Sequence, residues 1–264
     1  MPTKYNITDE QIKEFYRLRT EEKLSFTKIG QLFGISPQTV QRRLHDLGYQ
    51  PEDLIKTYQY DKFYFYDIDT SEKAYWLGFI TADGYINKER NVFSFHLGWN
   101  DRNHLEKFKK AIKGNMPIKT MIHKITRKNI AVLDINGKEF IQGLILNDVR
   151  NNKSMNEKPS PKIPEKFYRD YIRGLWDGDG YISKRKIGFC SSYIMCKWVQ
   201  DILIQKCKIP KNKISFDSNI YRINISKGKT DVMKWLYYFG SKDISLDRKY
   251  KLAKIYTLRY LKTH

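Results

Sequence analysis

The stretch YWLGFITADGYI (75–86) returns in altered form as YIRGLWDGDGYI (171–182). Both copies have Tyr, Gly, Asp, Gly, Tyr and Ile at matching positions, and Tyr171 follows Tyr75 by 171 − 75 = 96 residues. Each copy places an aspartate, Asp83 or Asp179, at the end of an apolar segment and directly before a glycine. The sequence therefore predicts two related halves, each built around a helix that ends in an acid.

The composition predicts a globular, strongly basic protein. The chain has 264 residues, 41% of them hydrophobic, which is enough for two or three compact units. It has 49 Lys and Arg against 29 Asp and Glu, which gives a net charge of +20. A basic excess spread along the whole chain attracts polyanions, because phosphate neutralisation provides most of the non-specific affinity for nucleic acid. Charge alone is also compatible with a membrane surface or a ribosomal role.

No segment of the sequence is apolar enough to cross a bilayer, and the first residues lack the apolar core of a signal peptide. We therefore expect a cytoplasmic protein. The three cysteines, Cys190, Cys196 and Cys207, form no CxxC pair and are expected to be reduced structural thiols.

Residues 8–49 resemble a helix-turn-helix unit. After a first helix over about 8–20, Gly34 makes a turn, Ser36 is a natural N-cap and Pro37 suits a first helical position. The buried stripe of the last helix is expected to be Val40, Leu44 and Leu47. This leaves polar residues near the helix start, where such a helix meets base edges in the major groove. These candidate DNA-binding residues are Gln38, Thr39, Gln41, Arg42 and Arg43. A plain three-helix bundle would show the same periodicity.

From residue 71 onward each repeat is predicted to be an αββαββα unit, so the fold class is α+β. The expected domains are 1–50 (helix-turn-helix), 51–70 (an aromatic linker that packs on the following domain), 71–155 (first repeat) and 156–264 (second repeat). In the first repeat we expect helices at 72–83, 101–113 and 138–147, and strands at 91–99, 118–126 and 129–136. In the second we expect helices at 166–179, 192–206, 229–239 and 247–261, and strands at 185–190, 213–218 and 220–226.

Small residues lie four apart on each motif helix, Gly78 with Ala82 and Gly174 with Gly178. Such pairs let two helix backbones approach closely. We therefore expect the two motif helices to pack against each other about a pseudo-twofold axis, which brings the two acids together.

Gly84 and Gly180 are expected to end these helices in the left-handed conformation. Each acid then lies where the helix dipole is already negative, and two carboxylates about 4 Å apart repel by roughly 4 kcal/mol at a dielectric of 20. Carboxylates beside unpaired helical carbonyls describe a site for a hard divalent cation. The predicted metal ligands are Asp83, Asp179, Ala82 and Gly178, the last two through their carbonyls. The expected cofactor is Mg²⁺, or Mn²⁺ or Ca²⁺ in a non-cleaving state.

The segments WLGFITADG (76–84) and IRGLWDGDG (172–180) resemble the two motifs of LAGLIDADG homing endonucleases, and the repeat extends the likeness over 71–264. The resemblance implies a monomer with two saddle-shaped sheets that lie along the major groove of double-stranded DNA, at a long and partly asymmetric target. It also implies metal-dependent cleavage of both strands, with Asp83 and Asp179 as the catalytic, metal-binding acids. The sixth motif position, an acid in the family, is Thr81 in one copy and Asp177 in the other. We assign neither of them a catalytic role.

The resemblance further implies a lysine after the last strand of each half, near the scissile phosphate. Lys138 and Lys229 occupy these places, with Lys227 as a competitor of Lys229. Two bridging metals would provide most of the charge stabilisation that phosphodiester hydrolysis requires.

Polar positions on the strands are the candidates for base contacts. In the first half these are Ser94, His96, Lys124 and Thr126. In the second half they are Lys186, Arg222, Asn224 and Ser226. The other histidines, His45, His104, His123 and His264, are expected to be surface groups.

Two alternatives use the same scaffold without being DNA endonucleases: an RNA maturase and a non-cutting transcriptional regulator. Regulators of this kind commonly lose the acid pair, which is intact here. An intein is disfavoured, because the chain begins Met1-Pro2 and ends Thr263-His264.

Overall fold

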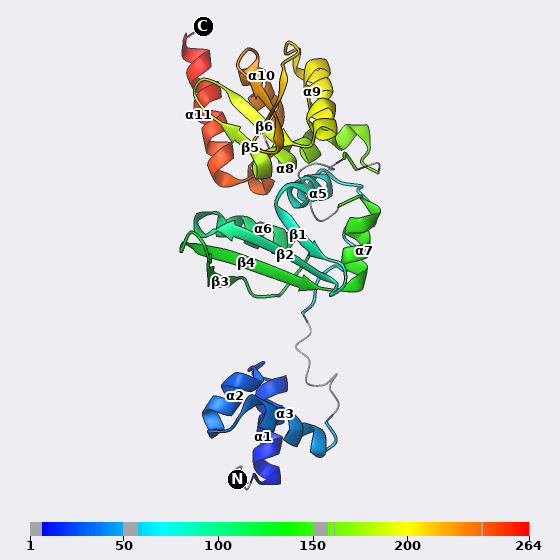
Figure 1. Ribbon diagram of the computed structural model, residues 1–264, viewed down its shortest axis with the longest axis vertical. Coiled ribbons are helices and arrows are strands. Elements are labelled where there is room, and N and C mark those ends of the chain that lie inside the picture. The colour runs from blue at the N-terminus through cyan, green and yellow to red at the C-terminus, as the bar shows by residue number, and fades with distance from the viewer. Residues whose placement is uncertain (1–6, 50–57, 150–157, 161, 239, 264) are drawn as a thin grey trace. The chain divides into compact units, whose positions relative to one another are not determined.

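The computed structural model describes residues 7–49, 58–149, 158–160, 162–238 and 240–263 (Figure 1). The chain divides into two units, Met1–Tyr58 and Gln59–His264. In the described residues, no helix combines the length and the apolar character that a membrane span requires.

The first unit is a three-helix unit with the predicted caps. Its helices are α1 (Asp9–Thr20), α2 (Phe26–Phe33) and α3 (Pro37–Asp46). The Ser36 side chain accepts a bond from the Thr39 N–H at the start of α3, and Gly34 ends α2 with a φ of 66°. The core consists of Ile12, Phe15, Leu18, Ile29, Ile35, Val40 and Leu44. Leu47 was predicted to be buried, which is wrong: it lies beyond the last turn of α3 and is 41% exposed.

The second unit contains two copies of the predicted αββαββα order, followed by one further helix. The first copy comprises α5 (Ser71–Asp83), β1 (Gly84–Asn87), β2 (Val92–Gly98), α6 (Arg102–Ala111), β3 (Lys119–Ile122), β4 (Asn129–Asn136) and α7 (Lys138–Leu146). The second comprises α8 (Tyr168–Asp179), β5 (Gly180–Ile182), β6 (Ile187–Ser191), α9 (Tyr193–Cys207), β7 (Ile214–Asp217), β8 (Ile220–Ile225) and α10 (Lys229–Leu236). The additional helix is α11 (Asp247–Thr263). The α+β fold class is thus confirmed.

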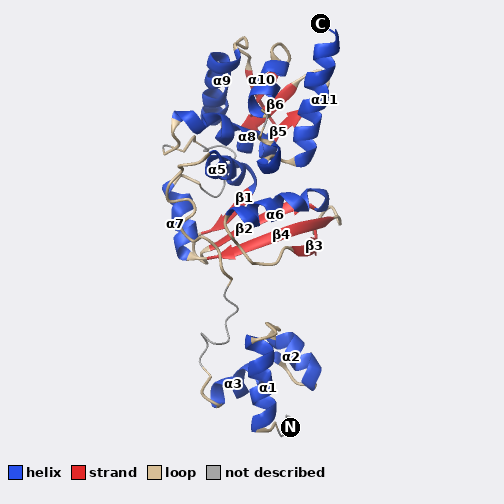
Figure 2. Ribbon diagram, turned by 180° about the vertical axis from the view of Figure 1, so that it is seen from behind, coloured by secondary structure: helices blue, strands red, loops and turns tan. Residues whose placement is uncertain are grey.

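The two sheets have the same topology, β1-β2-β4-β3 and β5-β6-β8-β7, and every neighbouring pair is antiparallel. Helices cover one face of each sheet, and α5 and α8 lie between the two sheets (Figure 2). On the covered face of the first sheet, Phe93 and Phe95 pack against Phe108 of α6, and Phe93 also packs against Phe140 of α7. The opposite face of each sheet carries most of the polar strand residues.

The described part of the aromatic segment, from residue 58 to residue 70, packs on the first repeat. The Tyr60 hydroxyl donates to the Asn136 carbonyl at 2.7 Å, and the Phe65 ring packs edge-on against Phe140. Tyr64 and Phe65 are buried. These aromatic side chains therefore belong to the core of the second unit.

The backbones of the two repeats approach each other closely where α5 packs against α8. A Cβ placed on Gly78 would lie 2.1 Å from the Tyr171 carbonyl oxygen, and one placed on Gly174 would lie 2.1 Å from the Tyr75 carbonyl oxygen. Because Tyr75 and Tyr171 are equivalent motif positions, the two contacts are reciprocal. This reciprocity is what a pseudo-twofold axis produces, and it confirms the predicted packing of the small-residue faces.

The glycines that follow the acids are not left-handed, which corrects the sequence prediction. Gly84 has φ −77° and Gly180 has φ −89°, both extended, because each helix runs directly into a strand. Glycine is required there for space. A Cβ on Gly180 would lie 2.5 Å from the Trp176 carbonyl oxygen, and one on Gly84 would lie 2.8 Å from the Ile80 carbonyl oxygen. Strands β1 and β5 were not located from sequence, because they are short and follow the helix without a break.

We predict that Gly174→Ala destabilises the second unit by about 1–3 kcal/mol, because its methyl group would force two helix backbones apart. Urea unfolding monitored by tryptophan fluorescence measures this loss. Gly98→Ala is the matched control, since a Cβ on Gly98 meets no atom within 4 Å. Equal stability of the two variants would show that the α5–α8 contact tolerates separation.

Candidate metal and nucleic-acid site

The two motif acids lie at equivalent helix ends. Asp83 is the last residue of α5 and is exposed, and Asp179 is the last residue of α8 and is half-buried. A Cβ on Gly178 would lie 3.4 Å from the Asp83 Oδ2 atom and 2.3 Å from the Ala82 Cβ atom. The Asp83 carboxylate therefore lies against the last turn of α8.

A buried lysine of α11, Lys249, places its side chain at the C-terminal end of α8. Lys249 is 3% exposed. Its Nζ lies within hydrogen-bond distance of four carbonyl oxygens, those of Trp176 at 2.7 Å, Asp177 at 2.6 Å, Gly178 at 3.2 Å and Gly180 at 2.5 Å, which share its three N–H donors. These carbonyls form the negative end of the α8 dipole, where a cation is favoured. Sequence analysis missed this residue, because nothing local in α11 distinguishes it from the other lysines there.

The pKa of Lys249 is lowered to about 8. Burial is the main cause of the lowered pKa, and the positive charge of Arg248 lowers it further. The negative charges of Asp177, Asp83 and Asp179 raise the pKa and so offset part of this effect. The side chain is therefore mostly an ammonium ion at neutral pH, and both motif acids interact with that charge.

The residues at the helix ends fit a hard divalent cation in part. Asp83 and Asp179 supply carboxylate oxygens, the ligand type that Mg²⁺ prefers. No cluster of three or more His, Cys, Asp or Glu side chains suited to a metal occurs among the described residues. Further ligands would have to be carbonyls, water or a phosphate of a bound nucleic acid. The Gly178 carbonyl, a predicted ligand, already accepts a bond from Lys249.

The acid at the sixth motif position, Asp177, is a structural group. It is fully buried and accepts bonds from the Tyr75 hydroxyl at 2.7 Å, the Tyr237 hydroxyl at 2.6 Å and the Leu246 N–H at 2.8 Å. Burial raises the pKa of this carboxyl, while Lys249 and the three donors lower it. Asp177 thus joins to α8 both α5 and the segment between α10 and α11, where Tyr237 and Leu246 lie.

His104 extends this network and is buried, so its predicted surface position is wrong. Its Nε2 lies 2.9 Å from the Tyr75 hydroxyl. That hydroxyl gives its only proton to Asp177, so His104 Nε2 must carry the hydrogen and donate it. Burial lowers the pKa of His104 well below its usual range, and the charges of Lys107, Arg248 and Lys249 lower it further.

The two predicted catalytic lysines differ in their surroundings. Lys138 is exposed at the first residue of α7. Lys229, the first residue of α10, donates from Nζ to the carbonyls of Lys184 at 2.6 Å and Arg185 at 3.0 Å. Lys229 therefore holds the β5–β6 turn.

The predicted base-contacting residues of the first half are not all on strands. His96 is exposed on the polar face of β2. Ser94 lies on the same strand but is buried, and it donates to Asp134 at 2.7 Å. Lys124 and Thr126 are exposed in the β3–β4 turn, because β3 ends at Ile122 rather than near residue 126 as predicted.

In the second half, Arg222 and Asn224 lie on β8, as predicted. Arg222 donates to the Cys190 sulfur at 3.2 Å, and the Asn224 side chain accepts a bond from the Tyr181 hydroxyl. Lys186 and Ser226 are exposed but lie just outside β6 and β8, so their predicted strand positions are wrong.

On α3, Gln38, Gln41 and Arg42 are exposed. Thr39 and Arg43 are half-buried, and the Thr39 hydroxyl lies 2.8 Å from the Ser36 hydroxyl within the helix cap. The first three side chains are therefore the more accessible members of the predicted set.

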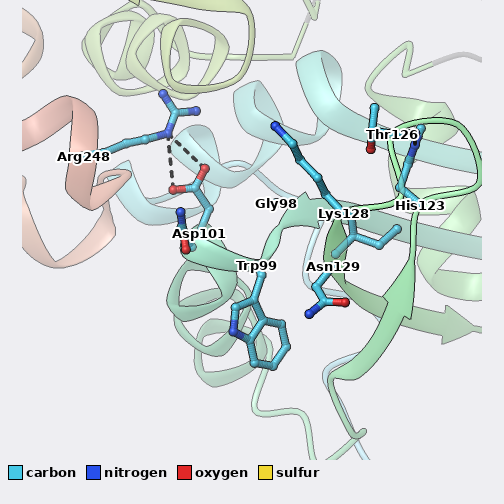
Figure 3. Close-up of a pocket in the computed structure, with 10 residues that line it drawn as sticks. Gly98, Trp99, Asp101, His123, Thr126, Lys128, Asn129 and Arg248 are labelled. Carbon is cyan, nitrogen blue, oxygen red and sulfur yellow. Dashed lines mark hydrogen bonds and ion pairs between the residues drawn. The ribbon is translucent and has the colours of Figure 1, made fainter.

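A pocket of about 560 Å³ lies beside the ion pair between Asp101 and Arg248 (Figure 3). Its wall includes Trp99 after β2, Thr126 and Lys128 at the β3–β4 turn, and Arg248 of α11. Arg248 Nε lies 3.0 Å from Asp101 Oδ2. The pocket lies between the start of α11 and the end of the first sheet that carries the β3–β4 turn, and no motif residue lines it.

Comparison with known proteins gives a family match that covers the first repeat. Residues 70–144 match the family model of the LAGLIDADG-like domain. No curated protein matches the sequence.

Several solved structures resemble the chain at low identity. Full-length DUF199/WhiA from Thermatoga maritima has a TM-score of 0.48 and 14% identity, over 76% of this chain and 65% of that one. The homing endonuclease I-WcaI bound to its DNA recognition sequence has a TM-score of 0.48 and 16% identity, over 70% and 87%. The LAGLIDADG meganuclease I-AabMI bound to uncleaved DNA has a TM-score of 0.43 and 17% identity, over 72% and 93%. At these values the similarities carry no information on activity.

We predict that acidification destabilises the second unit through His104. The folded state keeps His104 neutral, whereas the unfolded chain binds a proton below the ordinary histidine pKa, so stability falls as the pH falls below about 6.5. The loss is about 1.4 kcal/mol per pH unit for one proton. Asp177, whose pKa is raised, opposes this effect at lower pH.

His104→Gln removes the titration while keeping an N–H donor for Tyr75, and it leaves Asp177 in place. Urea unfolding between pH 7.5 and pH 5.5 should show a shallower pH dependence for this variant. The same slope in both proteins would contradict the role given to His104.

Proposed function

We propose that the protein is a site-specific double-stranded DNA endonuclease, because residues 70–144 match the model of the LAGLIDADG-like domain and residues 168–236 repeat the same elements. The observation that carries the proposal is the position of Asp83 against the last turn of α8, the helix that ends in Asp179. A carboxylate pair at a protein surface, in a chain of net charge +20, suits a metal ion that acts on a polyanion. It acts as a monomer, since one chain carries both motifs, and within the cell, where DNA is in reach.

The polar faces of the two sheets provide the proposed surface for DNA. His96 is exposed on the first sheet, and Lys124 and Thr126 extend that face at the β3–β4 turn. Arg222 and Asn224 lie on the second sheet. An antiparallel sheet with one polar face can follow a groove of the duplex over several base pairs, which suits a long target.

Asp83 and Asp179 would hold the divalent cation, with Mg²⁺ as the proposed physiological ion. When bound, such a cation supplies charge stabilisation at phosphorus and lowers the pKa of a bound water. Lys138, exposed at the start of α7, is the better placed of the two predicted lysines to meet a phosphate, because Lys229 is bonded to two carbonyls. Asp177 keeps the structural role described above.

A non-cutting DNA-binding regulator is the second candidate, and the position of Lys249 favours it. The ammonium ion already balances charge at the end of α8. The acid pair is therefore compatible with a folded protein that binds DNA and needs no metal.

We predict that Asp83→Asn and Asp179→Asn each reduce DNA cleavage by about a thousandfold or more, while DNA affinity changes by less than about threefold. The substrate is a plasmid library that includes the DNA flanking the gene, incubated with Mg²⁺, and the ends are sequenced. Asp201→Asn, at an exposed site on α9, is the matched control. Cleavage of both strands by either motif variant would refute the proposal, and a wild-type protein that binds DNA without cutting it would establish the regulator instead.

We also predict that the first unit adds affinity for the target rather than chemistry. Residues 59–264 alone should bind the target about 10–100-fold more weakly, with a smaller dependence on salt concentration, and should still cut it. Fluorescence anisotropy at several salt concentrations measures both effects. Arg42→Ala, which changes one exposed residue of α3, should reproduce part of the loss, and unchanged affinity of the truncated protein would rule out the helix-turn-helix interpretation.

A further inference from the structure

The ammonium near the acid pair comes from a helix that has no counterpart among the described residues of the first repeat. Lys249 lies on α11, which follows the completed αββαββα repeat. In the described part of the corresponding connection after α7, residues 147–149, 158–160 and 162–167, the structure has a 3-10 turn and no α-helix. The two halves of the pseudo-twofold site therefore differ in fixed charge.

Ion pairs of the two residues that directly precede Lys249, Asp247 and Arg248, hold the start of α11 in place. Lys107 of α6 lies 2.8 Å from Asp247, and it also donates to the Ser245 carbonyl at 2.8 Å. Arg248 pairs with Asp101 at 3.0 Å. Both partners belong to the first repeat, so α11 is anchored across the two repeats while Lys249 reaches the end of α8.

The Lys249 ammonium occupies the kind of position that a divalent cation would use. It has oxygen partners only, the carbonyls of Trp176, Asp177, Gly178 and Gly180. One of these, the Gly178 carbonyl, precedes Asp179 and is the oxygen that the sequence pattern offers as a metal ligand. The ammonium is buried, and the motif acids contribute to its electrostatic environment. A second cation at this helix end would have to compete with a fixed one.

We propose that Lys249 replaces one of two metal ions, so that the acid pair of this protein binds a single divalent cation. Lys249 acts through the acids and the α8 carbonyls and is a positioning residue. The inference rests on the proposed metal-dependent function, and it narrows that function from a two-metal site to a site with one metal and one ammonium.

Titration of the whole protein with Mn²⁺, followed by the electron paramagnetic resonance signal of free Mn²⁺, counts the bound ions. The double variant Asp83→Asn, Asp179→Asn gives the background that does not depend on the acid pair. The difference should be one ion for the wild-type protein. A difference of two ions, or of none, would overturn the proposal, and this measurement needs no change at Lys249.

Lys249→Gln tests the cause, because its amide can still donate to carbonyls but carries no charge. We expect two acid-dependent ions in this variant. Lys249→Met removes the donor as well and should give the same count if it folds, which circular dichroism reports. Lys251→Met is the matched control: it removes an exposed lysine from the same helix and should leave one ion. One ion in a folded Lys249→Gln variant would show that the lysine is only a helix cap.

The experiments distinguish a failure of the role proposed for Lys249 from a failure of the proposed endonuclease function. A protein that cuts DNA and binds two acid-dependent ions keeps the endonuclease assignment and loses the role of Lys249. A protein that binds one acid-dependent ion and cuts no DNA keeps the role of Lys249 and loses the endonuclease assignment.

Discussion

The close approach of α5 and α8 is the constraint on which the second unit depends. Gly78 and Gly174 each lie against a tyrosine carbonyl of the other helix, at a distance that leaves no room for a Cβ. Because the helices end at Asp83 and Asp179 and continue directly into β1 and β5, this one contact sets the position of both acids and the start of both sheets. A change in helix separation would therefore move the site and the two sheets together.

The pseudo-twofold symmetry is broken at the sixth motif position. The Thr81 hydroxyl donates to the Leu77 carbonyl at 2.8 Å, within α5. It also accepts a long bond of 3.5 Å from the Tyr171 hydroxyl of α8. Asp177 instead ties α8 to Tyr75, Tyr237 and the Leu246 N–H. A buried carboxylate is stable only with such partners, and the partners come partly from the segment that leads into α11. The unequal motif residues and the additional helix are thus parts of one arrangement.

The sequence was sufficient for most elements of the repeat, for the Ser36 cap of α3 and for the α5–α8 contact, because each leaves a pattern within one short segment or its repeated copy; the short strands β1 and β5 left no such pattern. The sequence did not predict the positions of side chains whose partners lie far away in the chain. The buried position of His104 depends on Tyr75 and Asp177, and Lys249 is set apart from the other lysines of α11 only by the carbonyls at the end of α8. The extended conformation of Gly84 was missed because close packing and left-handed backbone both select glycine.

An ammonium group that is part of the protein and a free metal ion differ in when they lose their hydration near the two acids. The ammonium of Lys249 loses hydration on burial and is stabilised by four carbonyls and by Asp177, all of which belong to the protein itself. A metal ion must instead lose part of its hydration shell at each binding event. Since the fixed charge also lowers the repulsion between Asp83 and Asp179, it stabilises the empty site and weakens the attraction for any further cation. The same residue thus favours a folded protein without metal and limits how many ions that protein binds.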